Sequence, residues 1–73
     1  MYYVSYKKLW KMLIDRDMKK KELQLAAKIS SSTMSKLNRS QNMQMDVLVR
    51  ICHVLECDIG DIVEVLPPTD SER

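Results

Sequence analysis

The chain has 73 residues, of which 45% are hydrophobic and 30% are charged, and its net charge is +2. This length and composition predict one small globular domain and exclude a disordered chain. With one glycine, two prolines and no long apolar run, the sequence favours helices over a turn-rich β protein and excludes a transmembrane helix.

The charge is distributed unevenly along the chain. Residues 1–39 hold ten Lys or Arg against three Asp or Glu, a net charge of +7, whereas residues 40–73 hold two against seven, a net charge of −5. A basic half indicates an anionic partner, and nucleic acid is the commonest one. The alternative is a dipolar surface that only keeps the protein soluble.

The two ends of the chain are its β-prone parts. Residues 1–5 and 62–66 are rich in Tyr, Val and Ile, which suit extended strands. Because a strand needs a partner, we expect the two ends to pair, either within one chain or between two chains.

An amphipathic helix is predicted directly after the first strand. Its apolar residues follow the i, i+3, i+4, i+7, i+8 spacing of one helical face: Tyr6, Leu9, Trp10, Leu13 and Ile14. We interpret Trp10, the largest apolar side chain, as a core anchor.

Two short helices joined by a tight turn are predicted for residues 20–37. An apolar helical face begins at Leu23 and is interrupted at Lys28. A left-handed residue is convenient at this turn, and it costs about 1 kcal/mol if Lys28 adopts a positive φ. Residues 30–32 are serines that can cap the second of these helices.

The second helix has two different faces. Met34 and Leu37 form its inner face. Its outer residues are small or cationic: Ser31, Ser32, Thr33, Ser35 and Lys36. An apolar back with a hydrogen-bonding front fits a helix that enters the major groove of DNA, and the alternative is an ordinary helical hairpin with a solvated serine face.

Cations flank this helix pair. Three lysines, residues 19–21, stand at the start of the first helix, where they oppose the helix dipole. A phosphate bound at this helix end would explain why three cations stand there, and the alternative is a basic turn that is simply solvated. Arg39 lies in the polar loop that follows the second helix, where a phosphate contact fits.

The last elements complete a predicted domain over residues 1–66. Residues 45–55 form the clearest helix, and Asp58 can cap a final short helix over residues 59–63. Two prolines then stop regular structure, so we expect residues 67–73 to be a flexible tail.

From about residue 5 to residue 63 the chain resembles the phage-repressor and Cro-type helix-turn-helix regulators, also called the xenobiotic-response-element family, and in particular its small stand-alone members. The resemblance rests on an ordered set of landmarks: Leu23, Ala27, Ile29, Ser30, Met34, Ser35, Leu37, Leu48, Ile51, Leu55, Asp58 and Ile62. It implies a compact all-α, five-helix bundle like the lambda repressor, a sequence-specific double-stranded DNA-binding repressor of transcription, and a homodimer.

The expected DNA contacts come partly from the resemblance and partly from the residues themselves. The resemblance implies base contacts by Ser31, Ser32 and Lys36, and phosphate or backbone contacts by Lys20, Thr33, Asn38, Arg39 and Gln41. The residue pattern adds Ser35 to the base-facing set and Lys19, Lys21 and Lys28 to the phosphate-facing set. The chain departs from the family pattern at Lys20, Gln24 and Lys28, where a Gln, a small residue and a Gly are usual. The two lysines add positive charge at these places.

The sequence gives little reason to expect other chemistry. Cys52, His53 and Cys57 are too few for a four-ligand zinc site, and no catalytic constellation is present, so we expect no enzyme, metal or cofactor. We also expect no membrane partner and no small-molecule ligand. The N-terminus lacks the apolar run of a signal peptide, so we expect a cytoplasmic protein with reduced thiols.

The rival hypothesis is a protein-interaction module or an antitoxin-like protein that docks a partner through its apolar ends. The same residues are the predicted homodimer interface: Tyr2, Tyr3, Val4, Val63, Val65 and Leu66.

Overall fold

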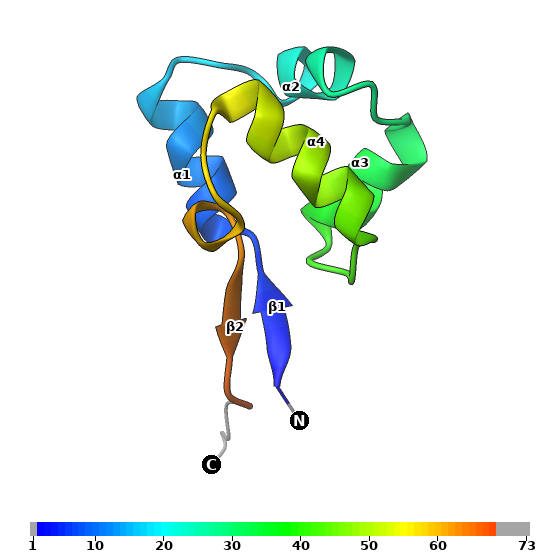
Figure 1. Cartoon of the computed structure of the whole chain (residues 1–73). Helices are drawn as coiled ribbons and strands as arrows, with labels where there is room; N and C mark the ends of the chain where they lie inside the picture. Colours follow the sequence, from blue (N-terminus) through cyan, green and yellow to red (C-terminus); the bar gives the residue numbers. More distant parts are fainter. Residues whose placement is uncertain (1, 69–73) are drawn as a thin grey trace.

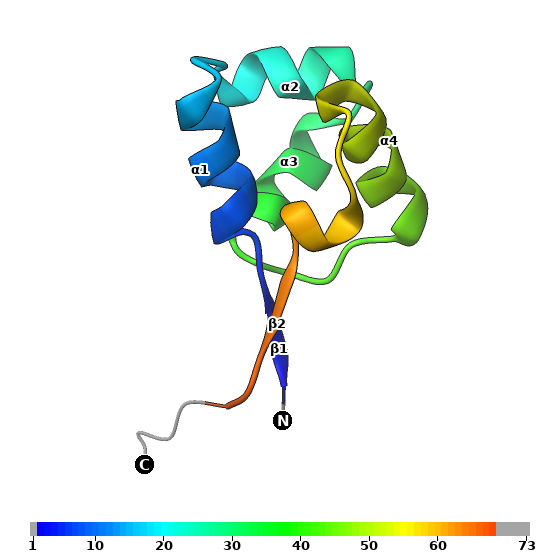
Figure 2. The same ribbon diagram turned by 60° about the vertical axis from the view of Figure 1, so that its left-hand side comes forward.

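The computed structural model describes residues 2–68 and contains a helical body with a two-stranded ribbon (Figure 1). The elements in chain order are β1 (Tyr3–Ser5), α1 (Lys7–Asp15), α2 (Lys20–Ala26), α3 (Ser31–Asn38), α4 (Met45–Leu55), the 3₁₀ turn η1 (Ile59–Asp61) and β2 (Glu64–Leu66). Figure 2 shows the ribbon projecting from one end of the helices.

The ribbon confirms that the two ends of the chain pair, and it does so within one chain. β1 and β2 are antiparallel, with Tyr3 opposite Leu66 and Val4 opposite Val65. Ser5 is buried at the base of the ribbon. Within residues 2–68 the sheet has only two strands, so each strand has one unpaired edge.

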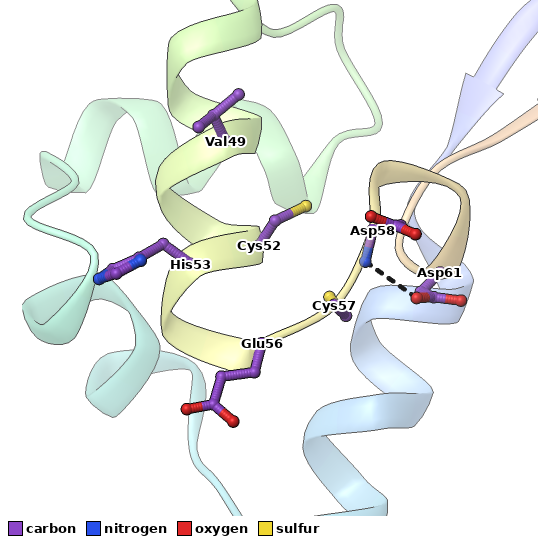
Figure 3. A pocket seen from close by; sticks show the side chains of 7 residues that line it. All are labelled: Val49, Cys52, His53, Glu56, Cys57, Asp58 and Asp61. Atoms are coloured by element: carbon purple, nitrogen blue, oxygen red, sulfur yellow. Dashed lines mark hydrogen bonds between the residues drawn. The ribbon is translucent and has the colours of Figure 1, made fainter.

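Four α-helices are present among residues 2–68, and the predicted fifth is only a single turn. The backbone N–H of Asp58 donates to Oδ2 of Asp61 at 2.9 Å, which closes η1 (Figure 3). Ile62 already has φ −121° and ψ −20°, outside helical geometry. The β-branched residues that follow pair with β1 instead, because extended backbone suits them better than a helix. Of the predicted tail, residues 69–73 lie outside the described part of the chain.

All four α-helices end in the same backbone motif without a glycine. The left-handed residue follows the C-cap in α1, α2 and α3 and is the C-cap itself in α4, with φ of 54–57°: Asp17, Lys28, Ser40 and Glu56. The next amide donates to the carbonyl five residues earlier at N···O distances of 2.9–3.1 Å: Met18 to Leu13, Ile29 to Gln24, Gln41 to Lys36 and Cys57 to Cys52. This is the Schellman motif. The left-handed conformation expected for Lys28 is confirmed.

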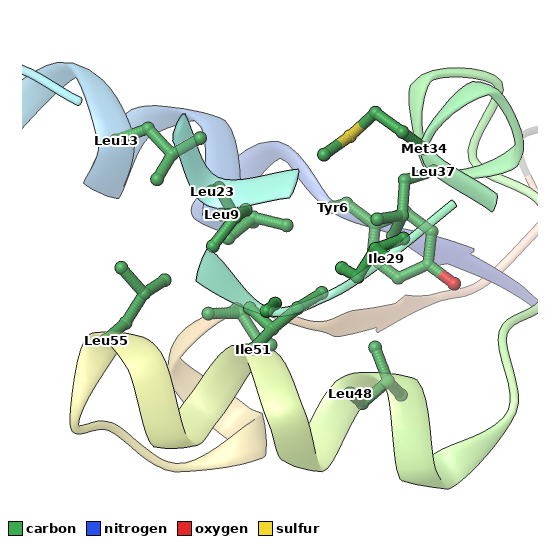
Figure 4. Close-up of a cluster of buried hydrophobic side chains, with 12 residues drawn as sticks. Tyr6, Leu9, Leu13, Leu23, Ile29, Met34, Leu37, Leu48, Ile51 and Leu55 are labelled. Carbon is green, nitrogen blue, oxygen red and sulfur yellow. The ribbon is translucent and has the colours of Figure 1, made fainter. Parts of the chain in front are cut away.

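The core lies between the four helices and η1 (Figure 4). Its buried members are Tyr6, Leu9, Leu13, Leu23, Ala27, Ile29, Met34, Leu37, Leu48, Ile51, Leu55 and Ile62. Ile14, predicted to share the apolar face of α1, is 77% exposed. It lies 100° around the helix from Leu13 and falls beyond the edge of the buried stripe. Trp10 is half-buried at the rim of the core rather than at its centre.

Candidate nucleic-acid interface

α3 presents a polar face because its apolar face is fully used by the core. Ser30 caps the helix: its Oγ accepts the N–H of Thr33 at 3.2 Å. Met34 and Leu37 are buried. The residues on the opposite side therefore form an exposed stripe at i, i+3, i+4 and i+7: Ser32, Ser35, Lys36 and Arg39.

All four residues expected to contact bases lie on the exposed surface of α3. Ser31, Ser32, Ser35 and Lys36 are exposed, and Ser31 flanks the stripe rather than lying at its centre. Thr33, expected to contact phosphate, is half-buried and accepts a hydrogen bond from Ser30 Oγ at 2.9 Å. The side chains available to bases are thus three short hydroxyls and one long cation.

Two residues expected to contact phosphate are held together across α2 and α3. Nζ of Lys20 donates to Oδ1 of Asn38 at 2.7 Å. The same ammonium lies 4.2 Å from the ring centroid of Trp10, a cation–π contact that tethers Lys20 to α1. Because Asn38 accepts through its oxygen, its amide N–H groups are left to donate to another acceptor. The half-buried Trp10 therefore helps to position a cation.

The other lysines at the start of α2 remain exposed, and Glu22 caps one N–H of this helix end. The N–H of Lys19 donates to Oε1 of Glu22 at 2.7 Å. Glu22 also offsets the positive charge that was expected to attract phosphate to this end. Lys19 and Lys21 thus supply exposed charge, whereas the N–H of Lys19 is already paired with Glu22.

The turn between α2 and α3 depends on Arg50, which the sequence did not indicate as part of this site. Nη1 of Arg50 donates to the carbonyl of Lys28 at 3.1 Å, and Nη2 contacts Oδ2 of Asp46 at 2.8 Å. The hydrogen bond from Arg50 lowers the pKa of Asp46 below its usual 3.8. The i, i+4 pairing of Asp46 with Arg50 is visible in the sequence, but the reach to Lys28 is not.

A hydrogen bond from Tyr6 in the core holds the loop after α3. Its buried hydroxyl donates to the carbonyl of Gln41 at 2.7 Å, and burial raises the pKa of Tyr6. Asn42 and Gln44 of this loop line a surface hollow of about 210 Å³ beside Lys36. Both are exposed polar residues that were not singled out from the sequence, although they continue the polar run that begins after α3. Arg39 and Gln41 are exposed in the same region.

This arrangement of two short helices around a tight turn, with an exposed polar second helix, can be compared with known families. A family model described as a Cro/C1-type HTH DNA-binding domain matches residues 8–68. The chain belongs to this family. The resemblance inferred from the sequence is confirmed, and the family consists of DNA-binding regulators, a class without enzymatic activity.

The chain is also similar to a solved structure of a transcriptional regulator. The chain is 55% identical to the transcriptional regulator VanUg over 92% of its own length and 89% of that chain, with a TM-score of 0.89. A comparison with curated proteins gives no match.

Among residues 2–68, none of the helices is long and apolar enough to cross a membrane. In the same part of the domain, no three His, Cys, Asp or Glu side chains are grouped to hold a metal ion.

Proposed function

We propose that the protein is a sequence-specific repressor of transcription in the cytoplasm that inserts α3 into the major groove of double-stranded DNA. The carrying observation is the exposed stripe of α3, which combines hydroxyls with Lys36 directly opposite a fully buried apolar face. A helix of this width and polarity suits the major groove. The DNA-binding domain that carries this helix is residues 1–66.

Base and phosphate contacts fall to different residues. Ser31, Ser32, Ser35 and Lys36 face base edges. The proposed phosphate contacts surround them: Lys19, Lys20, Lys21, Lys28, Thr33, Asn38, Arg39 and Gln41. Serine side chains discriminate bases weakly, so Lys36 and DNA shape carry most of the selectivity.

The protein binds its site as a homodimer through the ribbon. One domain of this size contacts one half-site, and two half-sites are needed for useful specificity. The ribbon exposes Tyr2, Tyr3 and Val65, which are 66%, 45% and 62% accessible, and its strand edges are free to pair. Val4, Val63 and Leu66 are half-buried beside them. Sedimentation that gives only monomer at high micromolar concentration contradicts this interface.

The same exposed ribbon supports a second candidate function, a module that docks another protein, as an antitoxin docks its toxin. In a pure interaction module the cations around α3 have no role in binding, whereas an antitoxin would combine partner docking with DNA binding.

Two matched lysine variants separate the candidates. Lys36→Ala removes one of the two cations of the α3 stripe, the one expected to contact bases, and we expect at least tenfold weaker duplex binding. Lys8→Ala removes the same charge on α1, where Nζ of Lys8 donates to the carbonyl of Gly60 beside η1. At the same salt concentration we expect this control to change affinity less than twofold. Equal affinities for the wild type and Lys36→Ala contradict the α3 surface.

A further inference from the structure

The two cysteines of the chain occupy the two positions at the end of α4 whose side chains meet. α4 ends at a left-handed Glu56, and the N–H of Cys57 donates to the carbonyl of Cys52 at 3.1 Å. In a Schellman motif the side chains of these two positions pack against each other. The other three helices carry different pairs there: Leu13 with Met18, Gln24 with Ile29 and Lys36 with Gln41.

The two thiols are neighbours at the end of α4. The backbone hydrogen bond joins the two residues directly, and the Cys52 side chain is near enough to raise the pKa of Cys57. A disulfide requires such proximity, since it joins Cα atoms roughly 4.4–6.8 Å apart. Figure 3 shows both sulfur atoms on the side of α4 that faces the following loop, whereas His53 points to the other side. The two sulfurs therefore lie on the same side of this helix end.

Both thiols are reachable by a small oxidant. Cys52 and Cys57 are free and half-buried, and both line an open surface hollow with Val49 and Asp61. Their remaining contacts are with the edge of the core. The pair is therefore neither sealed in the interior nor fully solvated.

We propose that Cys52 and Cys57 form a reversible redox pair that hydrogen peroxide converts to an intramolecular disulfide. One thiolate attacks the peroxide bond, becomes a sulfenic acid and releases hydroxide, which takes up the proton lost by that thiol. The second sulfur attacks the sulfenic sulfur, the S–S bond forms and water leaves. In total, two thiols and one peroxide give one disulfide and two waters. This site is independent of the proposed DNA surface.

The surroundings of Cys57 make the pair slow to react at neutral pH. Burial raises the pKa of the Cys57 thiol most, and the neighbouring Cys52 thiol raises it next. The carboxylate of Asp61 in η1 raises this pKa further, whereas the positive charge of Arg16, the C-cap of α1, lowers it. Because the thiolate is the nucleophile, oxidation should accelerate as pH rises above neutrality. The product joins α4 to the segment that leads into η1 and β2, at the opposite end of α4 from the loop after α3.

Peptide mass measurement on the whole protein tests the proposal. The folded chain is treated with hydrogen peroxide at pH 7 and pH 9, its free thiols are blocked with a maleimide, and it is cut with trypsin. Cleavage after Arg50 releases a peptide that starts at Ile51 and contains both cysteines. After oxidation we expect this peptide to be about 2 Da lighter and to carry no maleimide label. Oxidation should be faster at pH 9 than at pH 7. If the oxidised protein is treated with dithiothreitol before the maleimide, both cysteines should be labelled.

Three outcomes overturn the proposal: two retained maleimide labels, addition of oxygen atoms to the cysteines, or a cross-link between two copies of the peptide. Cys52→Ser and Cys57→Ser serve as controls that cannot form the internal bond. Because the wild-type chain carries the test, it stays decisive even if a serine variant folds poorly.

Discussion

The left-handed residues at the helix ends cost stability, and Glu56 allows this to be measured away from the proposed DNA surface. Glu56 has φ 54° and an exposed side chain at the C-terminus of α4. A residue with a Cβ pays about 1–2 kcal/mol for this conformation. Glycine avoids that cost but gives up about 0.4–1 kcal/mol through its greater freedom in the unfolded chain. Glu56→Gly should therefore raise the free energy of unfolding by about 0.5–1 kcal/mol.

Glu56→Ala is the matched control, because it removes the carboxylate and keeps the Cβ. We expect it to remain close to wild type, whereas Glu56→Gly should raise Tm by about 3–6 °C. Thermal and urea unfolding followed by circular dichroism give both values. If the glycine variant is no more stable than the alanine variant, the left-handed geometry carries no cost and the reasoning fails. Lys28→Gly should add a similar gain, since the two sites share no contact given by the structure.

Three further predictions concern single contacts. Tyr6→Phe removes the buried hydroxyl that supports the loop after α3, and urea unfolding should show a loss of about 1 kcal/mol; an unchanged midpoint contradicts the bond. The pKa of Asp46 is lower in the folded than in the unfolded chain, so the stabilisation from Arg50 is present above about pH 4 and is lost as pH falls through the folded pKa. The difference in free energy of unfolding between the wild type and Asp46→Asn should accordingly become smaller as the pH falls below about 4. A difference that stays constant with pH refutes this. The ammonium of Lys20 lies over Trp10, the only tryptophan, so DNA binding should change tryptophan fluorescence in the wild type and not in Lys20→Met.

The sequence predicted those parts of the fold in which one periodic pattern decides the outcome. Residues 45–55 form a helix with the expected bounds, because an unbroken apolar stripe and an acidic first turn point the same way. The pairing of the two ends also followed from β-propensity, although only the structure showed that it occurs within one chain.

The sequence-based predictions were wrong where packing against neighbouring elements decides whether a side chain is buried or a segment is helical. Ile14 satisfies the helical spacing, yet no element within residues 2–68 covers the side of α1 on which it lies, and it is exposed. Residues 59–63 have apolar helical spacing, but the helix ends after one 3₁₀ turn, and the residues that follow pair with β1 as the strand β2.

The candidate site was predictable only in outline. The polar face of α3 follows from the positions of Met34 and Leu37, which are visible in the sequence. Arg50 contacts the carbonyl of Lys28, which is 22 positions away in the sequence. The ammonium of Lys20 contacts the ring of Trp10, which is 10 positions away. Such contacts depend on how helices pack, and no spacing rule along one chain predicts them.

Titration of the wild-type protein against a mixed-sequence DNA duplex at two salt concentrations tests the central claim most directly. If four of the proposed cations contact phosphates, affinity should fall roughly hundredfold between about 50 and 200 mM salt. Salt-sensitive binding of this size supports a DNA surface around α3. The absence of binding at the lower salt concentration contradicts that surface and favours the protein-docking function of the ribbon.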